Sequence, residues 1–188
     1  RMAMTEAWLT QLPDPTGALE PVQRRGRLAL TEQGFPSRRQ ESWRLTDLKR
    51  LEALFQLSLA NDSSHVSIPD SWPTVPEQAL RLVVNNTNDP LAGFDLPEGI
   101  SILEGVELEQ ALGHTLSRCQ CASEWPVELN HGVNQQILAL RIRGKVPPIE
   151  LVTFATDAMF MPTRVLLLVE EKAELEVLQV VIAKGHAA

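Results

Sequence analysis

The sequence predicts an α+β fold in which a mainly helical first part, residues 1–131, leads into a strand-rich second part, residues 132–188. In the first part, apolar residues recur at the three- and four-residue spacing of amphipathic helices. In the second part they alternate with other side chains, as in half-buried strands, most clearly over residues 138–143. With 44% hydrophobic residues among 188, the chain can bury a substantial core, which excludes a disordered protein.

Two helices are expected near the start of the chain. Met4, Trp8 and Leu12 share one face of a short amphipathic helix. A second helix should cover about residues 19–33 and end at Gly34, because glycine readily adopts the positive φ that follows a last helical turn.

The middle of the chain mixes loop, strand and helix patterns. Residues 60–78 are rich in Asn, Ser, Asp and Pro, a composition typical of a loop or linker. Short apolar runs at 80–84 and 100–103 predict strands, and the apolar spacing over 106–116 predicts a helix.

Further strands are expected at residues 149–154, 164–169 and 173–182, so the second part should be an all-β module. No closing element follows the last strand, and an uncapped sheet edge is prone to pair with another chain. We therefore expect that the chain is part of a longer protein and that it self-associates when isolated.

The overall charge and the termini disfavour several classes of function. Lys and Arg number 17 against 24 Asp and Glu, and the net charge of −7 disfavours binding to a phosphate backbone. The first residues lack the apolar core of a signal peptide, no apolar run is long enough to span a membrane, and two cysteines are too few for a secreted disulfide framework. These observations predict a soluble, cytoplasmic protein that binds neither nucleic acid nor membrane.

One segment, residues 21–50, departs from this acidic balance. The simplest interpretation is a solvated helix face, and the alternative is a surface for an acidic partner. Its basic residues are Arg24, Arg25, Arg27, Arg38, Arg39, Arg44, Lys49 and Arg50, against Glu32, Glu41 and Asp47.

No motif in the sequence predicts catalysis. The chain has neither a glycine-rich phosphate loop nor a Gly-x-Ser-x-Gly nucleophile elbow. Glu41 and Arg44 flank Trp43, but no partner base stands at a supporting spacing, so packing and ion pairing explain them better. We therefore nominate no catalytic or cofactor-binding residue and expect that the chain is not an enzyme.

The one metal-like set of residues is His114, Cys119, Cys121 and His131. Thiolates and imidazoles suit zinc or an iron–sulfur cluster, and four ligands are the right number. The spacing argues against ligation, because a Cys-x-Cys pair lacks the two-residue gap of a zinc knuckle. We expect two small buried or loop thiols rather than a metal site, and keep a small metal-binding protein as the alternative function.

The most specific segment is residues 41–48, which reads Glu-Ser-Trp-Arg-Leu-Thr-Asp-Leu and comes shortly after Gly34-Phe35-Pro36. Its physical interpretation is structural. Trp43 is a large apolar anchor, and Thr46 stands in a capping position ahead of a helix with apolar residues on one face.

Together with Arg38, this string resembles the N-terminal signature of the SufB/SufD family, and of its SufD branch in particular. One departure is Leu45, where the family commonly has Tyr. Residues 134–142, 147–149 and 162–173 are similar to that family's entry into a right-handed β-helix. The resemblance therefore implies that the strands of the second part begin such a helix, or β-solenoid.

The resemblance also implies a non-catalytic scaffold subunit. SufD-like proteins act with a SufB-like scaffold and the SufC-like ATPase, and this SufBCD complex of the SUF system builds iron–sulfur clusters. The cluster and ATP would be handled through these partners. No cofactor is therefore expected in this chain, and no site residue of the family can be placed on it.

Overall fold

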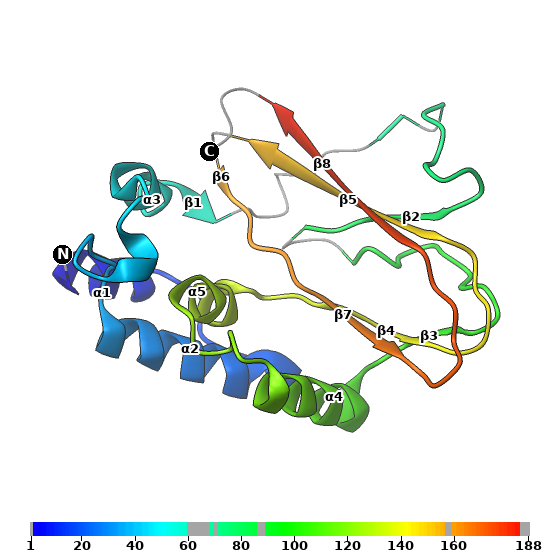
Figure 1. Ribbon diagram of the computed structural model, residues 1–188, viewed down its shortest axis with the longest axis horizontal. Helices are drawn as coiled ribbons and strands as arrows, with labels where there is room; N and C mark the ends of the chain where they lie inside the picture. The colour runs from blue at the N-terminus through cyan, green and yellow to red at the C-terminus, as the bar shows by residue number, and fades with distance from the viewer. Residues whose placement is uncertain (1, 60–67, 70, 86–88, 157–158, 185–188) are drawn as a thin grey trace.

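The computed structural model describes residues 2–59, 68–69, 71–85, 89–156 and 159–184 (Figure 1). Of the predicted loop at 60–78, residues 60–67 and 70 lie outside this described part. The helices and 3-10 turns are α1 (Met2–Leu9), η1 (Gly17–Leu19), α2 (Glu20–Gln33), η2 (Glu41–Trp43), α3 (Leu48–Leu54), α4 (Gly105–Arg118) and α5 (Trp125–Val133). The strands are β1 (Ser58–Leu59), β2 (Leu80–Val83), β3 (Ile100–Ile102), β4 (Leu138–Ile142), β5 (Ile149–Thr156), β6 (Met159–Phe160), β7 (Val165–Val169) and β8 (Val177–Lys184).

The described strands form three small sheets. One has the order β2-β5-β8 with all strands parallel, and β1 pairs with β6 in parallel. The third has the order β3-β4-β7, in which β3 is antiparallel and β7 parallel to β4. The registers set Leu82 beside Leu151 and Leu140 beside Leu167, so large apolar side chains form rows across the sheets.

The predicted start of a right-handed β-helix is wrong. Within the described residues the strands lie in separate small sheets, β3 pairs antiparallel with β4, and no closed solenoid forms. Helices α4 and α5 lie between β3 and β4 along the chain, so the protein has a mixed α/β fold. Alternation predicts which face of a strand is buried but not which strand lies beside it, and the sequence pattern therefore did not exclude this arrangement.

The sheet β3-β4-β7 separates two apolar cores. On one face, Leu138, Leu140 and Ile142 of β4 pack with Leu82 of β2 and Ile149 of β5, so this core lies between the two three-stranded sheets. The other face packs on α4 and η1, and its buried residues are Leu19, Leu103, Leu108, Leu112, Ala139 and Leu166. The two-residue period of β4 thus divides its side chains between the two cores.

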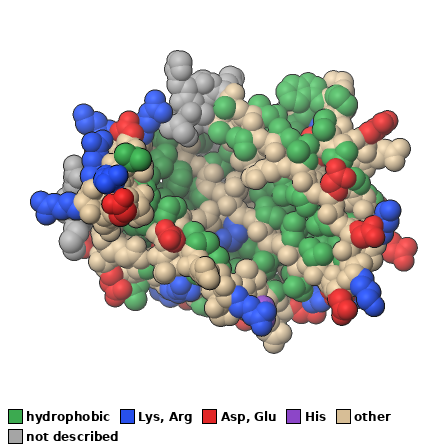
Figure 2. All heavy atoms as spheres, in the orientation of Figure 1, with side chains coloured by type: hydrophobic (Ala, Val, Ile, Leu, Met, Phe, Trp, Pro, Cys, Tyr) green, Lys and Arg blue, Asp and Glu red, His purple; other side chains and the backbone are tan. Residues whose placement is uncertain are grey.

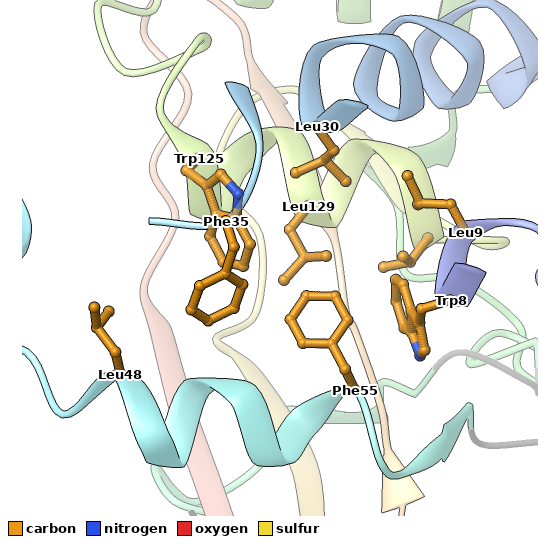
Figure 3. Packing of buried hydrophobic residues seen from close by; sticks show 9 residues of the cluster. Trp8, Leu9, Leu30, Phe35, Leu48, Phe55, Trp125 and Leu129 are labelled. Atoms are coloured by element: carbon orange, nitrogen blue, oxygen red, sulfur yellow. The ribbon is translucent and has the colours of Figure 1, made fainter. Parts of the chain in front are cut away.

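A third core holds the helices together (Figure 3). It is rich in aromatic rings, which meet edge-on: the Trp8 and Phe55 ring centroids are 4.8 Å apart, and those of Phe35 and Trp125 are 5.7 Å apart. Its buried members are Trp8, Leu9, Leu30, Phe35, Leu48, Phe55, Trp125, Leu129 and Val133. This core joins α1, α2, α3 and α5 into one helical layer.

The predicted helices near the start are confirmed as α1 and α2. Helix α2 ends at Gly34 as predicted. Gly34 has a positive φ of 68°, and its N–H donates to the Leu30 carbonyl at 3.0 Å. The predicted cap of α3 is one residue off. Asp47 rather than Thr46 precedes the helix, and its side chain accepts a hydrogen bond from the Lys49 N–H at 3.1 Å.

All three sheets combine strands from both sides of residue 131. The division into residues 1–131 and 132–188 stays a prediction. Among the described helices, none is both long and apolar enough to cross a membrane.

Candidate functional site

The segment 41–48 lies against the helical core through Trp43. The Trp43 ring meets Trp125 of α5 edge-on, with ring centroids 5.7 Å apart and an angle of 89° between the ring planes. The neighbouring charges point outward, since Arg44 Nη1 and Glu41 Oε1 are 3.8 Å apart and both side chains are exposed. The segment therefore uses its Trp for packing and its charges at the surface.

A pocket of ≈ 200 Å³ opens beside this aromatic pair. Its lining includes Trp43 and Trp125 together with the polar residues Gln33, Gln40, Ser42 and Ser123. The Gln33 side chain donates to the Ser123 carbonyl at 3.2 Å, and Trp125 Nε1 donates to the Gly34 carbonyl at 3.0 Å. Such amide and hydroxyl groups can hydrogen-bond a small polar group or a peptide.

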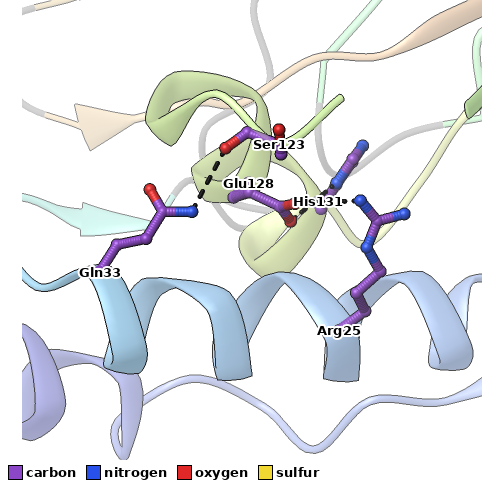
Figure 4. A network of polar contacts seen from close by, with 5 residues as sticks. All are labelled: Arg25, Gln33, Ser123, Glu128 and His131. Carbon is purple, nitrogen blue, oxygen red and sulfur yellow. Dashed lines mark hydrogen bonds and ion pairs between the residues drawn. The ribbon is translucent and has the colours of Figure 1, made fainter. Parts of the chain in front are cut away.

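A buried polar network joins α2 to α5 (Figure 4). Glu128 Oε1 is 3.1 Å from Arg25 Nη2, and Glu128 Oε2 is 3.2 Å from His131 Nδ1. Glu128 is 2% exposed and His131 1% exposed. A carboxylate this deeply buried requires such partners, so the network holds the two helices in one register.

The environment of His131 favours its neutral form. Burial lowers the pKa of His131, and the charge of Arg164 lowers it further, while the hydrogen bond to Glu128 acts in the opposite direction. Burial also lowers the pKa of Arg164, to about 10, although the charge of Glu128 raises it. Among the described residues, His131 Nε2 is buried and has no hydrogen-bond partner, which fits a structural imidazole better than one that exchanges protons with a substrate.

The same two helices touch through glycines. A Cβ added to Gly26 would lie 2.6 Å from the backbone nitrogen of Gly132 and 2.6 Å from the Cβ of His131. Arg27 Nε donates to the Gly132 carbonyl at 2.9 Å, and Gln23 Nε2 donates to the Asn134 carbonyl at 2.6 Å. Gly26 therefore marks a close contact between α2 and α5, where a side chain would collide with the facing helix.

In the described part of the chain, the four residues considered as candidate metal ligands do not come together. His114 is exposed on α4, Cys119 and Cys121 follow the end of that helix, and His131 is buried in α5 beside Glu128. In the described part of the chain, no three His, Cys, Asp or Glu side chains come together in a way that could hold a metal ion. Only the two cysteines meet, with their Sγ atoms 2.9 Å apart.

The basic residues of the segment at 21–50 divide into three groups. Arg24 forms an exposed ion pair with Glu20 on its own helix. Arg25 and Arg27 are used in the α2–α5 contact. The exposed remainder gathers around α3 and the segment before it, where Figure 2 shows a concentration of Lys and Arg side chains. Its members are Arg38, Arg39, Arg44, Lys49 and Arg50.

Helix α5 is the element of the candidate site that the sequence did not predict, and it supplies Trp125, Glu128 and His131. The helix is only 9 residues long and contains a Gly near its end, which weaken a helix prediction. Two local signals were present: Pro126 at a helix start and the four-residue spacing of Trp125, Leu129 and Val133.

A scan against protein-family models finds no match to this chain, and a search of curated proteins finds none either. The resemblance to the SufB/SufD family therefore rests on the residues of the signature segment and the similar stretches of the second part.

Proposed function

We propose that this chain is a non-catalytic scaffold protein of the SufD type, which acts with a SufB-like protein and a SufC-like ATPase in iron–sulfur cluster assembly. The observation that carries the proposal is the string at residues 41–48, with Gly34-Phe35-Pro36 and Arg38 before it. Eight consecutive residues with a central Trp-Arg-x-Thr-Asp-Leu are more specific than any other pattern in the chain.

The placement of these residues agrees with a scaffold role. Phe35, Trp43 and Leu48 pack in or against the helical core. At the surface, Glu41 pairs with Arg44 inside the segment, and Asp47 pairs with Arg50, which follows the segment. A segment that packs on one side and carries charges on the other is suited to shaping a binding surface.

Leu45 is the side chain of the segment with the clearest potential to contact a partner. It is 92% exposed, although it is large and apolar. The exposed Arg38, Arg39 and Lys49 lie within seven positions of it in the sequence. We propose that this surface faces an acidic region of one of the two partners.

The test is copurification from the native organism. The protein is tagged at its own locus and isolated under anaerobic conditions, and its partners are identified by mass spectrometry. We expect the SufB-like and SufC-like proteins in stoichiometric amounts. Recovery of the tagged protein with neither of them would contradict the proposal.

A matched pair of surface variants tests the contact at Leu45. Leu45→Glu should lower recovery of a partner several-fold, because it places an acidic group in the basic surface. Leu28→Glu is the control, since Leu28 is also exposed but lies on α2. Equal recovery of the partner with the two variants would show that the partner does not contact Leu45.

A further inference from the structure

Cys119 and Cys121 are held together by the turn that connects α4 to α5. The Cys119 N–H donates to the Thr115 carbonyl at 3.0 Å and completes the last turn of α4. The Cys119 carbonyl accepts from the Ala122 N–H at 3.2 Å, and the Cys121 carbonyl accepts from the Glu124 N–H at 3.0 Å. These backbone hydrogen bonds define the turn that brings the two Sγ atoms to 2.9 Å.

Both thiols are within reach of small molecules. Cys121 is exposed and Cys119 is half-buried. The pair is not used by the pocket or by the buried network on α5, which have other residues. It is thus a separate pair of nucleophilic groups at the surface.

We propose that Cys119 and Cys121 form a redox-active dithiol, which hydroperoxides oxidise to an intramolecular disulfide. The spacing permits the bond, because Cα atoms two residues apart are at most about 7 Å apart and disulfides accept about 4.4–6.8 Å. The sulfur atoms must approach from 2.9 Å to about 2.05 Å, a movement that side-chain rotation and a small shift of the turn can supply.

The reaction proceeds in two balanced steps. The Cys119 thiolate attacks one oxygen of the hydroperoxide; an S–O bond forms, the O–O bond breaks, and the leaving oxygen takes a proton to become water or an alcohol. Cys121 then attacks the sulfenic sulfur of Cys119. An S–S bond forms, the S–O bond breaks, and the hydroxyl leaves as water after accepting the Cys121 proton. The two sulfur atoms together give two electrons to the peroxide.

The environment assigns different roles to the two sulfurs. The side-chain hydrogen bond between the two thiols lowers the pKa of Cys119, and a backbone hydrogen bond from Cys121 adds to this effect. The same thiol–thiol hydrogen bond raises the pKa of Cys121. Since the thiolate is the nucleophile, Cys119 is the attacking residue and Cys121 the resolving one.

Oxidation would act on a wall of the pocket beside Trp43. Ser123 and Glu124 line that pocket and follow Cys121 by two and three residues. The Ser123 carbonyl accepts the hydrogen bond from Gln33 of α2. A disulfide would close a small ring in this turn and thereby restrain one side of the pocket.

The experiment measures oxidation of the reduced chain by hydrogen peroxide. After quenching, free thiols are alkylated and the intact mass is determined, with and without a reductant. The wild-type chain should lose the mass of two hydrogen atoms, lose both alkylation sites, remain a single chain, and recover both thiols on reduction. Oxidation that yields chiefly linked dimers or sulfinic acids would overturn the proposal.

Single variants test the assigned roles. Cys121→Ser should accumulate a sulfenic acid on Cys119 that a dimedone probe captures, and Cys119→Ser should react several-fold more slowly. Equal reactivity of the two variants would overturn the assignment of Cys119 as the attacking residue. The wild-type chain in urea is the control for the folded geometry. Disulfide formation should be several-fold slower there, and an equal rate would show that the turn does not promote the reaction.

Discussion

Glu128 and His131 lie one turn apart on α5, and Glu128 Oε2 is 3.2 Å from His131 Nδ1 with both side chains almost fully buried. The other oxygen of the same carboxylate is 3.1 Å from Arg25 of α2. One carboxylate thus joins a buried imidazole to a cation on the facing helix. Because unpaired buried charge is costly, stability should depend on each member of this group.

Glu128→Gln should lower the free energy of unfolding by about 2–3 kcal/mol, because it removes a buried charge on which two partners depend. Urea denaturation monitored by circular dichroism measures the change. The matched control is Glu20→Gln, which breaks the exposed pair with Arg24 and should cost about 0.5 kcal/mol or less. Similar losses in the two variants would contradict a special role for the buried carboxylate.

The stability of the protein should fall when the pH drops below about 6.5 because of His131. Burial holds its pKa in the folded state below the ordinary value of 6.5, so the unfolded chain binds the proton first. The stabilisation that depends on neutral His131 is fully present above pH 6.5 and is lost as the pH falls toward the folded-state pKa. The free energy of unfolding then changes by at most about 1.4 kcal/mol per pH unit.

Urea denaturation at a series of pH values measures this slope, and His131→Gln should flatten it. The carboxyl of Glu170 acts in a different range. Hydrogen bonds from Arg141 and Arg143 lower its pKa from 4.5, so its contribution is lost only below about pH 4.5. An unchanged slope between pH 5 and pH 6.5 in His131→Gln would rule out the histidine as its source.

Gly26→Ala should destabilise the protein by about 2–3 kcal/mol, although alanine favours helices, because the added methyl group meets the backbone of α5 at 2.6 Å. Thermal denaturation gives the comparison. Gly113→Ala in α4 is the control, since a Cβ there has no atom within 4 Å among the described neighbours. That variant should gain about 0.5–1 kcal/mol.

Trp43→Leu should cost about 1–3 kcal/mol, because it removes the edge-on contact with Trp125 and part of the apolar packing. Trp72→Leu is the control. Trp72 is 47% exposed, and its hydrogen bond to Arg81 uses the backbone carbonyl, which the substitution retains. The Trp72 variant should lie within about 0.5 kcal/mol of the wild type. A larger loss there than in the Trp43 variant would contradict the anchoring role of the signature tryptophan.

The isolated chain should self-associate along β8. In the described part of its sheet, β8 pairs with β5 on one side only, and Val181 is 59% exposed on it. Unpaired strand edges with apolar side chains favour pairing with a second copy. Light scattering after size exclusion should give a mass above that of one chain, and Val181→Lys should shift it toward the monomer. Val106→Lys on α4 is the control, and a wild-type monomer would contradict the prediction.

Sequence by itself determined the elements whose signals are local. The positive φ of Gly34 ends α2, and the alternation from Leu138 to Ile142 makes β4 a strand, because both depend on the conformation and polarity of adjacent residues. The prediction that Trp43 is an apolar anchor is also confirmed, since Trp43 packs against the helical core.

Tertiary structure decided the rest. The short helix α5 depends on the match of Gly26 with Gly132 and on the pairing of Glu128 with Arg25, both contacts between residues over 100 positions apart. The sheets likewise depend on strand pairing, which alternation does not encode. Local sequence patterns predict which face of a helix or strand is buried. Which other helix or strand packs on that face depends on packing and burial over the whole chain.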